Sequence, residues 1–195
     1  MKRFRKKIAA VVLAMVLMVA MAVPAFAVSS HIGIPLGQLG YWNPEQTNFT
    51  LNAFASSSAD NHTNVTTWPK DYSRSQRWTV RRTADNHYYI TTDLSKDFAL
   101  DYFWGASNNG NCDLYSVTDA AGNFNTDAYV TFITENSSAY SFGIKAEGRS
   151  LYLTEDHSKT ITYGSQSGYD VRWKAATYES TPSSQVWHFD WIDQG

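Results

Sequence analysis

The sequence predicts an all-β domain built from three repeats of about four strands each. Apolar residues alternate with polar ones in short runs, and clusters of Gly, Asn, Asp and Ser separate the runs, as at 88–92, 128–133 and 184–189. Tyr, Trp, Thr, Val and Phe are abundant in these runs, which suits a pleated, half-buried surface. Short aromatic and apolar motifs also recur with a period near fifty residues. Such a period indicates repeated structural units.

Three landmarks define each repeat. The first is a leucine about ten residues after an aromatic residue, at Leu51, Leu100 and Leu151. The second is an aromatic residue that ends a four-residue stretch of an expected strand, at 65–68, 112–115 and 170–173. The third is a triplet that ends in an aromatic residue, at 76–78, 130–132 and 185–187. About twelve strands result, which a closed barrel with a hairpin cap accommodates without free edges.

The N-terminus has the pattern of a secretory signal peptide. Five basic residues precede an apolar stretch at 8–23, and Ala25-Phe26-Ala27 gives a small-x-small cleavage site. We predict a signal peptide at 1–27, a secreted mature domain at 28–195 and no membrane insertion after cleavage. The alternative, an uncleaved anchor, needs roughly 20 apolar residues, and this stretch is shorter.

Charge and cysteine content narrow the function classes. Without residues 1–27 the chain has 11 basic and 18 acidic residues, a net charge of −7. Nucleic acids and anionic membranes favour clustered Lys and Arg, so neither is an expected partner. Cys112 is the only cysteine, so no intramolecular disulfide forms, and we expect a buried strand residue rather than a catalytic thiol.

We expect no catalysis, metal site or cofactor. The five histidines have no metal-ligand spacing, and no hydrolase elbow or phosphate loop occurs. Asp101 and Asp113 are conceivable as the two carboxylates of a glycosidase, but eighteen acidic residues make such pairs common by chance. The run Glu155-Asp156-His157 is interpreted as a solvated hairpin tip.

The stretch 100–115 resembles the signature of ricin B-type lectins and carbohydrate-binding modules, with Leu-Asp, then glycine, Asn-Gly and an aliphatic-aromatic pair. The triplets at 76–78 and 185–187 are similar to the Gln-x-Trp motif of that family. The resemblance covers nearly all of 36–193. It implies a β-trefoil with pseudo-three-fold symmetry whose core contains the triplet aromatics, here Trp78, Phe132 and Trp187.

The resemblance also implies a shallow sugar pocket within one repeat, where a carboxylate accepts from hydroxyl groups and a ring stacks on the apolar face of the sugar. Only the middle repeat retains the acidic residue, because Asn52 and Tyr152 stand at that position in the other two. The candidate carbohydrate-binding residues are Asp101, Trp104, Asn109, Asn111 and Tyr115. Alternatively, Asp101 is a turn residue that local amides satisfy.

The sequence thus predicts a secreted module that binds carbohydrate without catalysis, with weak affinity per site because shallow pockets bury little area. Its partner would be a cell-surface, cell-wall or plant glycan. The alternative is a protein-binding trefoil, either a Kunitz-like protease inhibitor or a toxin-associated accessory protein. An inhibitor needs a basic residue at a loop tip, and Lys70 and Arg74 are the nearest candidates.

Overall fold

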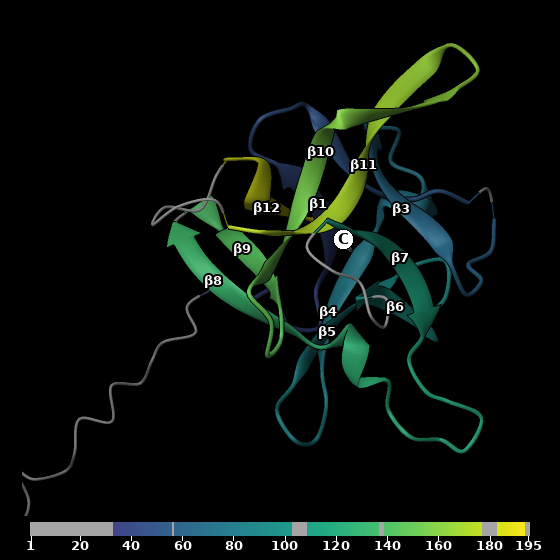
Figure 1. The fold of residues 1–195 in the computed structure, drawn as a ribbon, viewed down its shortest axis with the longest axis vertical. Helices are drawn as coiled ribbons and strands as arrows, with labels where there is room; N and C mark the ends of the chain where they lie inside the picture. Colours follow the sequence, from purple (N-terminus) through teal and green to yellow (C-terminus); the bar gives the residue numbers. More distant parts are fainter. Residues whose placement is uncertain (1–32, 56, 103–108, 137–138, 177–182, 194–195) are drawn as a thin grey trace, which may run out of the picture. The chain divides into compact units, whose positions relative to one another are not determined.

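The structure is a computed structural model that describes residues 33–55, 57–102, 109–136, 139–176 and 183–193. The expected signal peptide therefore lies outside the described residues. The described part contains twelve strands, four from each repeat, and short 3-10 helices (Figure 1). The strands are β1 (Leu39–Pro44), β2 (Phe49–Ala53), β3 (Thr63–Pro69), β4 (Trp78–Arg82), β5 (Tyr88–Thr92), β6 (Phe98–Tyr102), β7 (Gly110–Ser116), β8 (Val130–Asn136), β9 (Ser141–Ala146), β10 (Leu151–Tyr163), β11 (Gln166–Ala175) and β12 (Val186–Trp191).

Six strands, the first and last of each repeat, close into a barrel. The antiparallel pairs run β1–β4, β4–β5, β5–β8, β8–β9, β9–β12 and back from β12 to β1. Each repeat closes where its last strand meets its first, at Gly40↔Trp78, Tyr88↔Val130 and Phe142↔Trp187. Closure of this kind leaves no free edge on the barrel strands.

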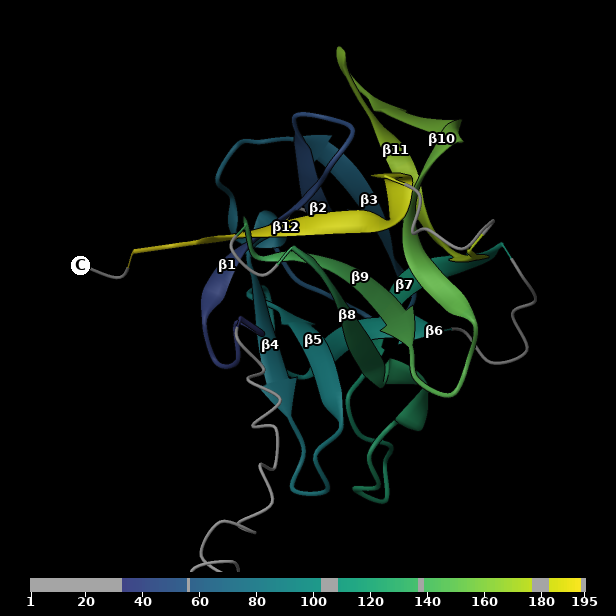
Figure 2. The same cartoon turned by 90° about the vertical axis from the view of Figure 1, so that its left-hand side faces the viewer.

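The middle two strands of each repeat form a hairpin, and the three hairpins cap one end of the barrel. The hairpins are β2–β3, β6–β7 and β10–β11. Their second strands pair with one another, β3 with β7, β7 with β11 and β11 with β3, which makes a triangular cap (Figures 1 and 2). A six-stranded barrel capped by three hairpins is a β-trefoil, so the predicted fold class is confirmed.

The core is aromatic, but the closing triplet of the middle repeat is not the predicted one. Trp78 and Trp187 are fully buried, as expected. In the middle repeat, Val130 holds the equivalent position, while Phe132 is only half-buried and stacks on Trp42 with ring centroids 5.8 Å apart. The predicted core position of Phe132 is therefore wrong by two residues. Cys112 is buried and free, as predicted.

The landmark leucine of the third repeat is also displaced by two residues. The Trp78 ring nitrogen donates to the Leu51 carbonyl, and that of Trp187 donates to the carbonyl of Leu153, each at 2.9 Å. Leu153, rather than Leu151, is thus the equivalent of Leu51. The position that matches Asp101 in the third repeat is consequently Thr154 and not Tyr152.

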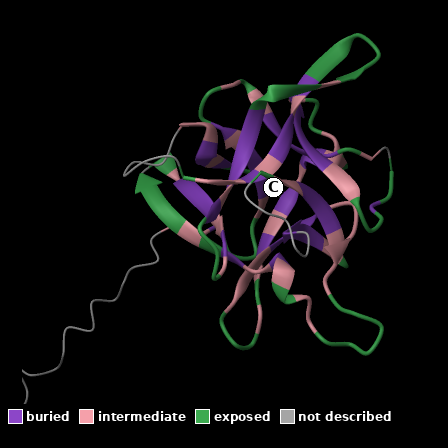
Figure 3. Ribbon diagram, viewed as in Figure 1, coloured by how far each residue is buried: buried purple, intermediate pink, exposed green. Residues whose placement is uncertain are grey.

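The strands of the third hairpin pair over a greater length than those of the other two. Its strands β10 and β11 have 13 and 10 residues, against 5 and 7 in β2 and β3. It projects beyond the cap, and its outer part is exposed while its base is buried (Figures 1 and 3). Glu155 and Asp156 lie in the buried base, so their predicted place at a solvated tip is wrong. The tip lies at Gly164 and Ser165, between the paired residues Tyr163 and Gln166.

Candidate carbohydrate-binding clefts

Each repeat brings three equivalent positions together beside its hairpin. The first, which we call the acceptor position, follows the core leucine and is occupied by Asn52, Asp101 or Thr154. The second, the platform position, lies two residues beyond the cross-strand partner of the first and is occupied by Trp68, Tyr115 or Lys174. Since side chains alternate across a strand, both positions face the same side of the hairpin. The third contribution is a 3-10 helix before the closing strand, at Arg74–Gln76, Thr126–Ala128 and Ser183–Gln185.

The first-repeat cleft is a hollow of about 390 Å³ that combines aromatic and polar side chains. This size falls within the range of roughly 300–1,000 Å³ typical of small-molecule sites. The lining comes from β2, β3 and the following loop, and from the tip of the β10–β11 hairpin: Asn52, Phe54, Ala55, Trp68, Asp71, Ser75, Tyr163 and Gln166. The cleft is thus shared between the first and third repeats.

Three rings form the apolar part of the first-repeat cleft. Phe54 lies between the other two, with ring centroids 5.6 Å from Trp68 and 6.1 Å from Tyr163. Trp68 is buried, while Phe54 is 38% and Tyr163 74% exposed. Exposed ring faces beside hydrogen-bonding groups are what a sugar needs, because its C–H face packs on the ring while its hydroxyls bind the polar groups.

Hydrogen bonds fix the polar part of the first-repeat cleft. The Asn52 amide donates to Thr66 Oγ1 at 3.3 Å, and its oxygen accepts from Ser75 Oγ at 3.0 Å. The Trp68 ring nitrogen donates to Gln166 Oε1 at 3.1 Å. The Asp71 carboxylate accepts from the Ser73 backbone at 2.9 Å. These bonds preorganise the side chains before a ligand arrives.

The middle repeat places two carboxylates opposite each other. Asp101 on β6 pairs with Asp113 on β7, and both are buried. Asn125 donates to Asp101 Oδ2 at 2.7 Å, and His62 Nδ1 lies 2.9 Å from Asp113 Oδ2. The other Asp113 oxygen, Oδ1, is buried without a hydrogen-bond partner among the described residues. A hydroxyl donor from a ligand would satisfy it.

Burial dominates the acid strength of this pair. Desolvation raises the pKa of Asp101 to about 6, against the opposing hydrogen bond from Asn125. Burial likewise raises the pKa of Asp113, and the contact with His62 opposes the rise. Near neutral pH the Asp101 carboxyl therefore exists in both protonation states, and it can accept from a hydroxyl or donate to one.

The other residues predicted for the middle-repeat site separate into different surroundings. Tyr115 is half-buried and meets the His62 ring edge-on at 5.2 Å, close to Asp113. Asn111 instead donates to Asn64 at 2.9 Å, where the three hairpins meet. The Asn109 backbone binds Trp173 and Arg172. Trp104 lies outside the described residues.

The third repeat carries ion pairs at the equivalent positions. Lys174, at the platform position, lies 2.8 Å from Asp156, and Arg172 lies 2.9 Å from Asp170. Glu155 is fully buried and accepts from Thr67 at 2.6 Å, with His157 also at 2.6 Å from its second oxygen. These side chains are engaged with one another. Among the described residues that line the hollow beside them, about 290 Å³, His157 has the only aromatic ring.

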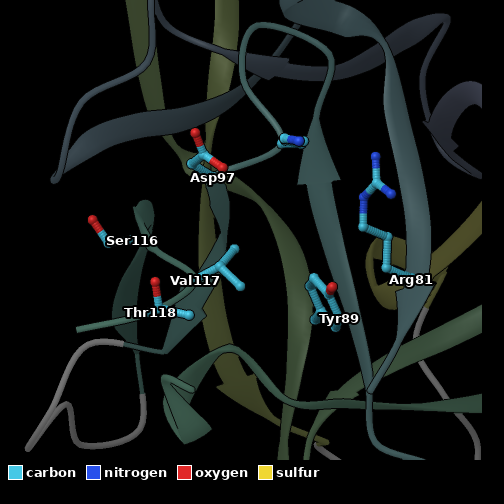
Figure 4. A pocket seen from close by; sticks show the side chains of 7 residues that line it. Arg81, Tyr89, Asp97, Ser116, Val117 and Thr118 are labelled. Atoms are coloured by element: carbon cyan, nitrogen blue, oxygen red, sulfur yellow. The ribbon is translucent and has the colours of Figure 1, made fainter. Parts of the chain in front are cut away.

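A further hollow of about 320 Å³ lies away from the three equivalent positions. Figure 4 shows Arg81 and Tyr89 from neighbouring strands on one side and Val117 at the end of β7 on the other. Lys96 and Asp97 also line it. Arg81 is anchored by donating to Thr91 at 2.9 Å. Its mixed charges and its place outside the repeat pattern set this hollow apart from the clefts.

The two candidate inhibitor residues are engaged with the protein's own surface. Lys70 lies 3.2 Å from the Asp190 carboxylate and 4.5 Å from the centre of the Tyr41 ring. The Arg74 guanidinium binds both the carboxylate and the backbone carbonyl of Asp93. The Lys70 side chain is 26% exposed and that of Arg74 60%.

The described residues also bear on two other classes of function. No helix in these ranges is both long and apolar enough to cross a membrane. No group of three or more His, Cys, Asp and Glu side chains in the same ranges is arranged to hold a metal ion.

The chain matches no protein-family model and no curated protein. Solved structures do resemble it. The designed three-fold symmetric protein ThreeFoil aligns with a TM-score of 0.63 and 15% identity over 79% of this chain and 99% of its own. The Rhizoctonia solani agglutinin aligns with a TM-score of 0.62 and 14% identity, over 80% of this chain and 96% of the agglutinin. An exo-β-1,3-galactanase from Clostridium thermocellum aligns with a TM-score of 0.62 and 18% identity, over 82% of this chain but only 31% of the enzyme. At these identities the likeness establishes the fold, and the chain is a β-trefoil similar in structure to lectins.

Proposed function

We propose that this protein binds carbohydrate without catalysing a reaction, as a secreted lectin-like module of the ricin B-type. The single observation that carries the proposal is the first-repeat cleft, where Phe54, Trp68 and Tyr163 stand beside the fixed amides Asn52 and Gln166. Apolar faces next to oriented donors and acceptors fit a pyranose, whose C–H face packs on a ring while its hydroxyls bind the polar groups. The structural likeness to agglutinins supports the same class.

The middle-repeat residues predicted from the sequence form a second candidate site of the same class. Asp101 and Tyr115 lie on one face of the β6–β7 hairpin, and Asp113 and His62 join them there. This site is more acidic and more buried than the first-repeat cleft. The first-repeat cleft is the stronger proposal because two of its rings, Phe54 and Tyr163, are exposed and its cavity is open.

Secretion belongs to the proposal as well. The basic, apolar and small-x-small segments of 1–27 support export and cleavage after Ala27. N-terminal sequencing of the protein recovered outside producing cells should begin at Val28. An intact N-terminus on a membrane-bound product would contradict this.

A glycan array tests the function and its location together. We expect the wild type to bind neutral glycans, and Phe54→Ala to weaken that binding about tenfold, which corresponds to about 1.4 kcal/mol. Trp191→Ala is the matched control, since Trp191 is an aromatic residue of similar exposure, 42%, outside the cleft. No binding to any glycan would contradict the proposed function. A loss with Asp101→Ala and none with Phe54→Ala would move the site to the middle repeat.

A further inference from the structure

The β10–β11 hairpin gives the first-repeat cleft a wall that its own repeat does not supply. The strands β2 and β3 have 5 and 7 residues, as do β6 and β7, whereas β10 and β11 have 13 and 10 and continue past the cap (Figures 1 and 2). Its register shifts between Asp156 and Thr160, and beyond that irregularity the strands pair again from Thr160↔Tyr169 to Tyr163↔Gln166. The outer part of the hairpin is therefore regular structure and not a loose loop.

Close packing holds this outer part against the first repeat. A Cβ atom at Gly168 would lie 1.9 Å from the Thr67 carbonyl oxygen and 2.7 Å from the Trp68 ring, so only glycine permits the approach. The next residue, Tyr169, pairs with Thr67 and packs between Phe49 and His157, with ring centroids at 5.8 and 4.6 Å. The hairpin thus stands at a fixed place beside β3.

Its tip brings two side chains to the cleft. Gln166 accepts from the Trp68 ring nitrogen, and the Tyr163 ring stands nearly perpendicular to that of Phe54, at 86°. Tyr163 is nevertheless 74% exposed, so most of its ring is available to a ligand. One sugar residue packed on Phe54 leaves the face of Tyr163 open to the next residue of the same glycan.

The charge of the lining selects among glycans. Asp71 is an acid, and none of the described residues that line the cleft is basic. A uronate or a sulfate group would meet this carboxylate without a compensating cation, whereas hydroxyl groups can donate to it. The lining therefore favours neutral sugars.

Building on the proposed carbohydrate-binding function, we propose that the β10–β11 hairpin makes the first-repeat cleft selective for neutral oligosaccharides of two or more residues. Phe54 and Trp68 hold one sugar residue, and Tyr163 holds its neighbour. Gln166 is a positioning residue that fixes Trp68 and the hairpin tip relative to each other.

The test compares affinities along a series of chain lengths. The probes are gluco-, galacto-, manno- and xylo-oligosaccharides of one to six residues, with oligogalacturonates of the same lengths as the acidic set. For the neutral sugar that binds, we expect the wild-type affinity to rise about tenfold between one and three residues. Tyr163→Ala should abolish that rise and leave the affinity for the single sugar within about twofold. Tyr163→Phe retains the ring and should behave as the wild type.

The outcomes separate the two proposals. If the wild type binds a neutral oligosaccharide and Tyr163→Ala binds it equally well, the hairpin is not a wall of the site, although the carbohydrate-binding function stands. Equal or stronger binding of the oligogalacturonates would overturn the selectivity for neutral glycans. If the wild type binds none of the probes, both proposals fail. Because Tyr163 is exposed, a circular dichroism spectrum and melting temperature matching those of the wild type should show that each variant is folded.

Discussion

In the first repeat the acceptor position holds Asn52, a neutral amide beside an open aromatic cleft, whereas in the middle repeat it holds Asp101, a buried carboxyl facing a second one. The backbone pairing around the two residues is the same. The difference comes from the side chains. In the first repeat it also comes from the tip of the third-repeat hairpin, which lines the cleft. The fold thus supplies three equivalent places, and among the described residues only the first-repeat place is an exposed aromatic cleft.

The same two repeats differ in their cores. Trp78 closes the first repeat with a buried ring and a hydrogen bond to Leu51, while Val130 closes the middle repeat with a small side chain. Trp173 from the third repeat donates to the Asp101 carbonyl at 2.8 Å, so a ring from another repeat occupies the space beneath the middle site. Three measurements test these differences between the repeats.

The largest effect is expected from the closing residues. Trp78→Ala should lower the free energy of unfolding by about 3–5 kcal/mol, because it leaves a large cavity and an unpaired carbonyl. Val130→Ala should cost only about 2 kcal/mol, since fewer buried atoms are lost. Urea denaturation of both variants measures the difference. Equal losses would mean that Val130 is not the equivalent of Trp78.

The second effect is a pH dependence confined to the middle repeat. The folded-state pKa of Asp101, about 6, exceeds its ordinary value of 3.8, so the folded state binds more protons between these values and stability increases as pH falls from 7 to 4. Asp101→Asn, which installs the residue type of the first repeat, should remove this contribution of up to about 3 kcal/mol. The measurement is the unfolding free energy of the variant minus that of the wild type.

That difference cancels the contributions of other carboxylates, including Asp156, whose pKa is lowered by Lys174 and Ser158 against the effect of burial. The free energy of unfolding of the variant, relative to that of the wild type, should increase as pH rises from 4 to 7. A difference that is independent of pH would show that Asp101 is not buried as a carboxyl.

The smallest effect concerns Asn111, which the sequence assigned to the middle site. Its bond to Asn64 lies where the hairpins meet, so Asn111→Ala should cost about 1 kcal/mol of stability and leave glycan affinity unchanged. Thermal unfolding and an array measurement test the two parts. If Asn111→Ala lost glycan affinity and kept its thermal stability, Asn111 would be a binding residue after all.

The sequence predicts the fold well because the period near fifty marks every repeat. Two of its errors are slips of two residues, Phe132 for Val130 and Leu151 for Leu153. Side chains alternate along a strand, so a slip of two residues preserves the apolar pattern and leaves periodicity unable to detect it. Only the cross-strand pairing and the tryptophan hydrogen bonds resolve the register.

The cleft was harder to foresee than the fold. Trp68 was visible as a repeated aromatic landmark, but Phe54 and Tyr163 are 109 positions apart and meet only because Gly168 lets the third hairpin pack on the first. A comparison of repeats looks for what they share. Tyr163 lies in β10 beyond the length over which the strands of the other two hairpins pair among the described residues, so the comparison of repeats did not indicate it.

One measurement tests the central claim that the first-repeat cleft is the glycan site. Isothermal titration with the tightest-binding neutral oligosaccharide should give one bound ligand per chain for the wild type. The same stoichiometry should be found for Asp101→Asn, with affinity reduced about tenfold for Phe54→Ala. More than one ligand per chain, or affinity lost in Asp101→Asn and retained in Phe54→Ala, would contradict it.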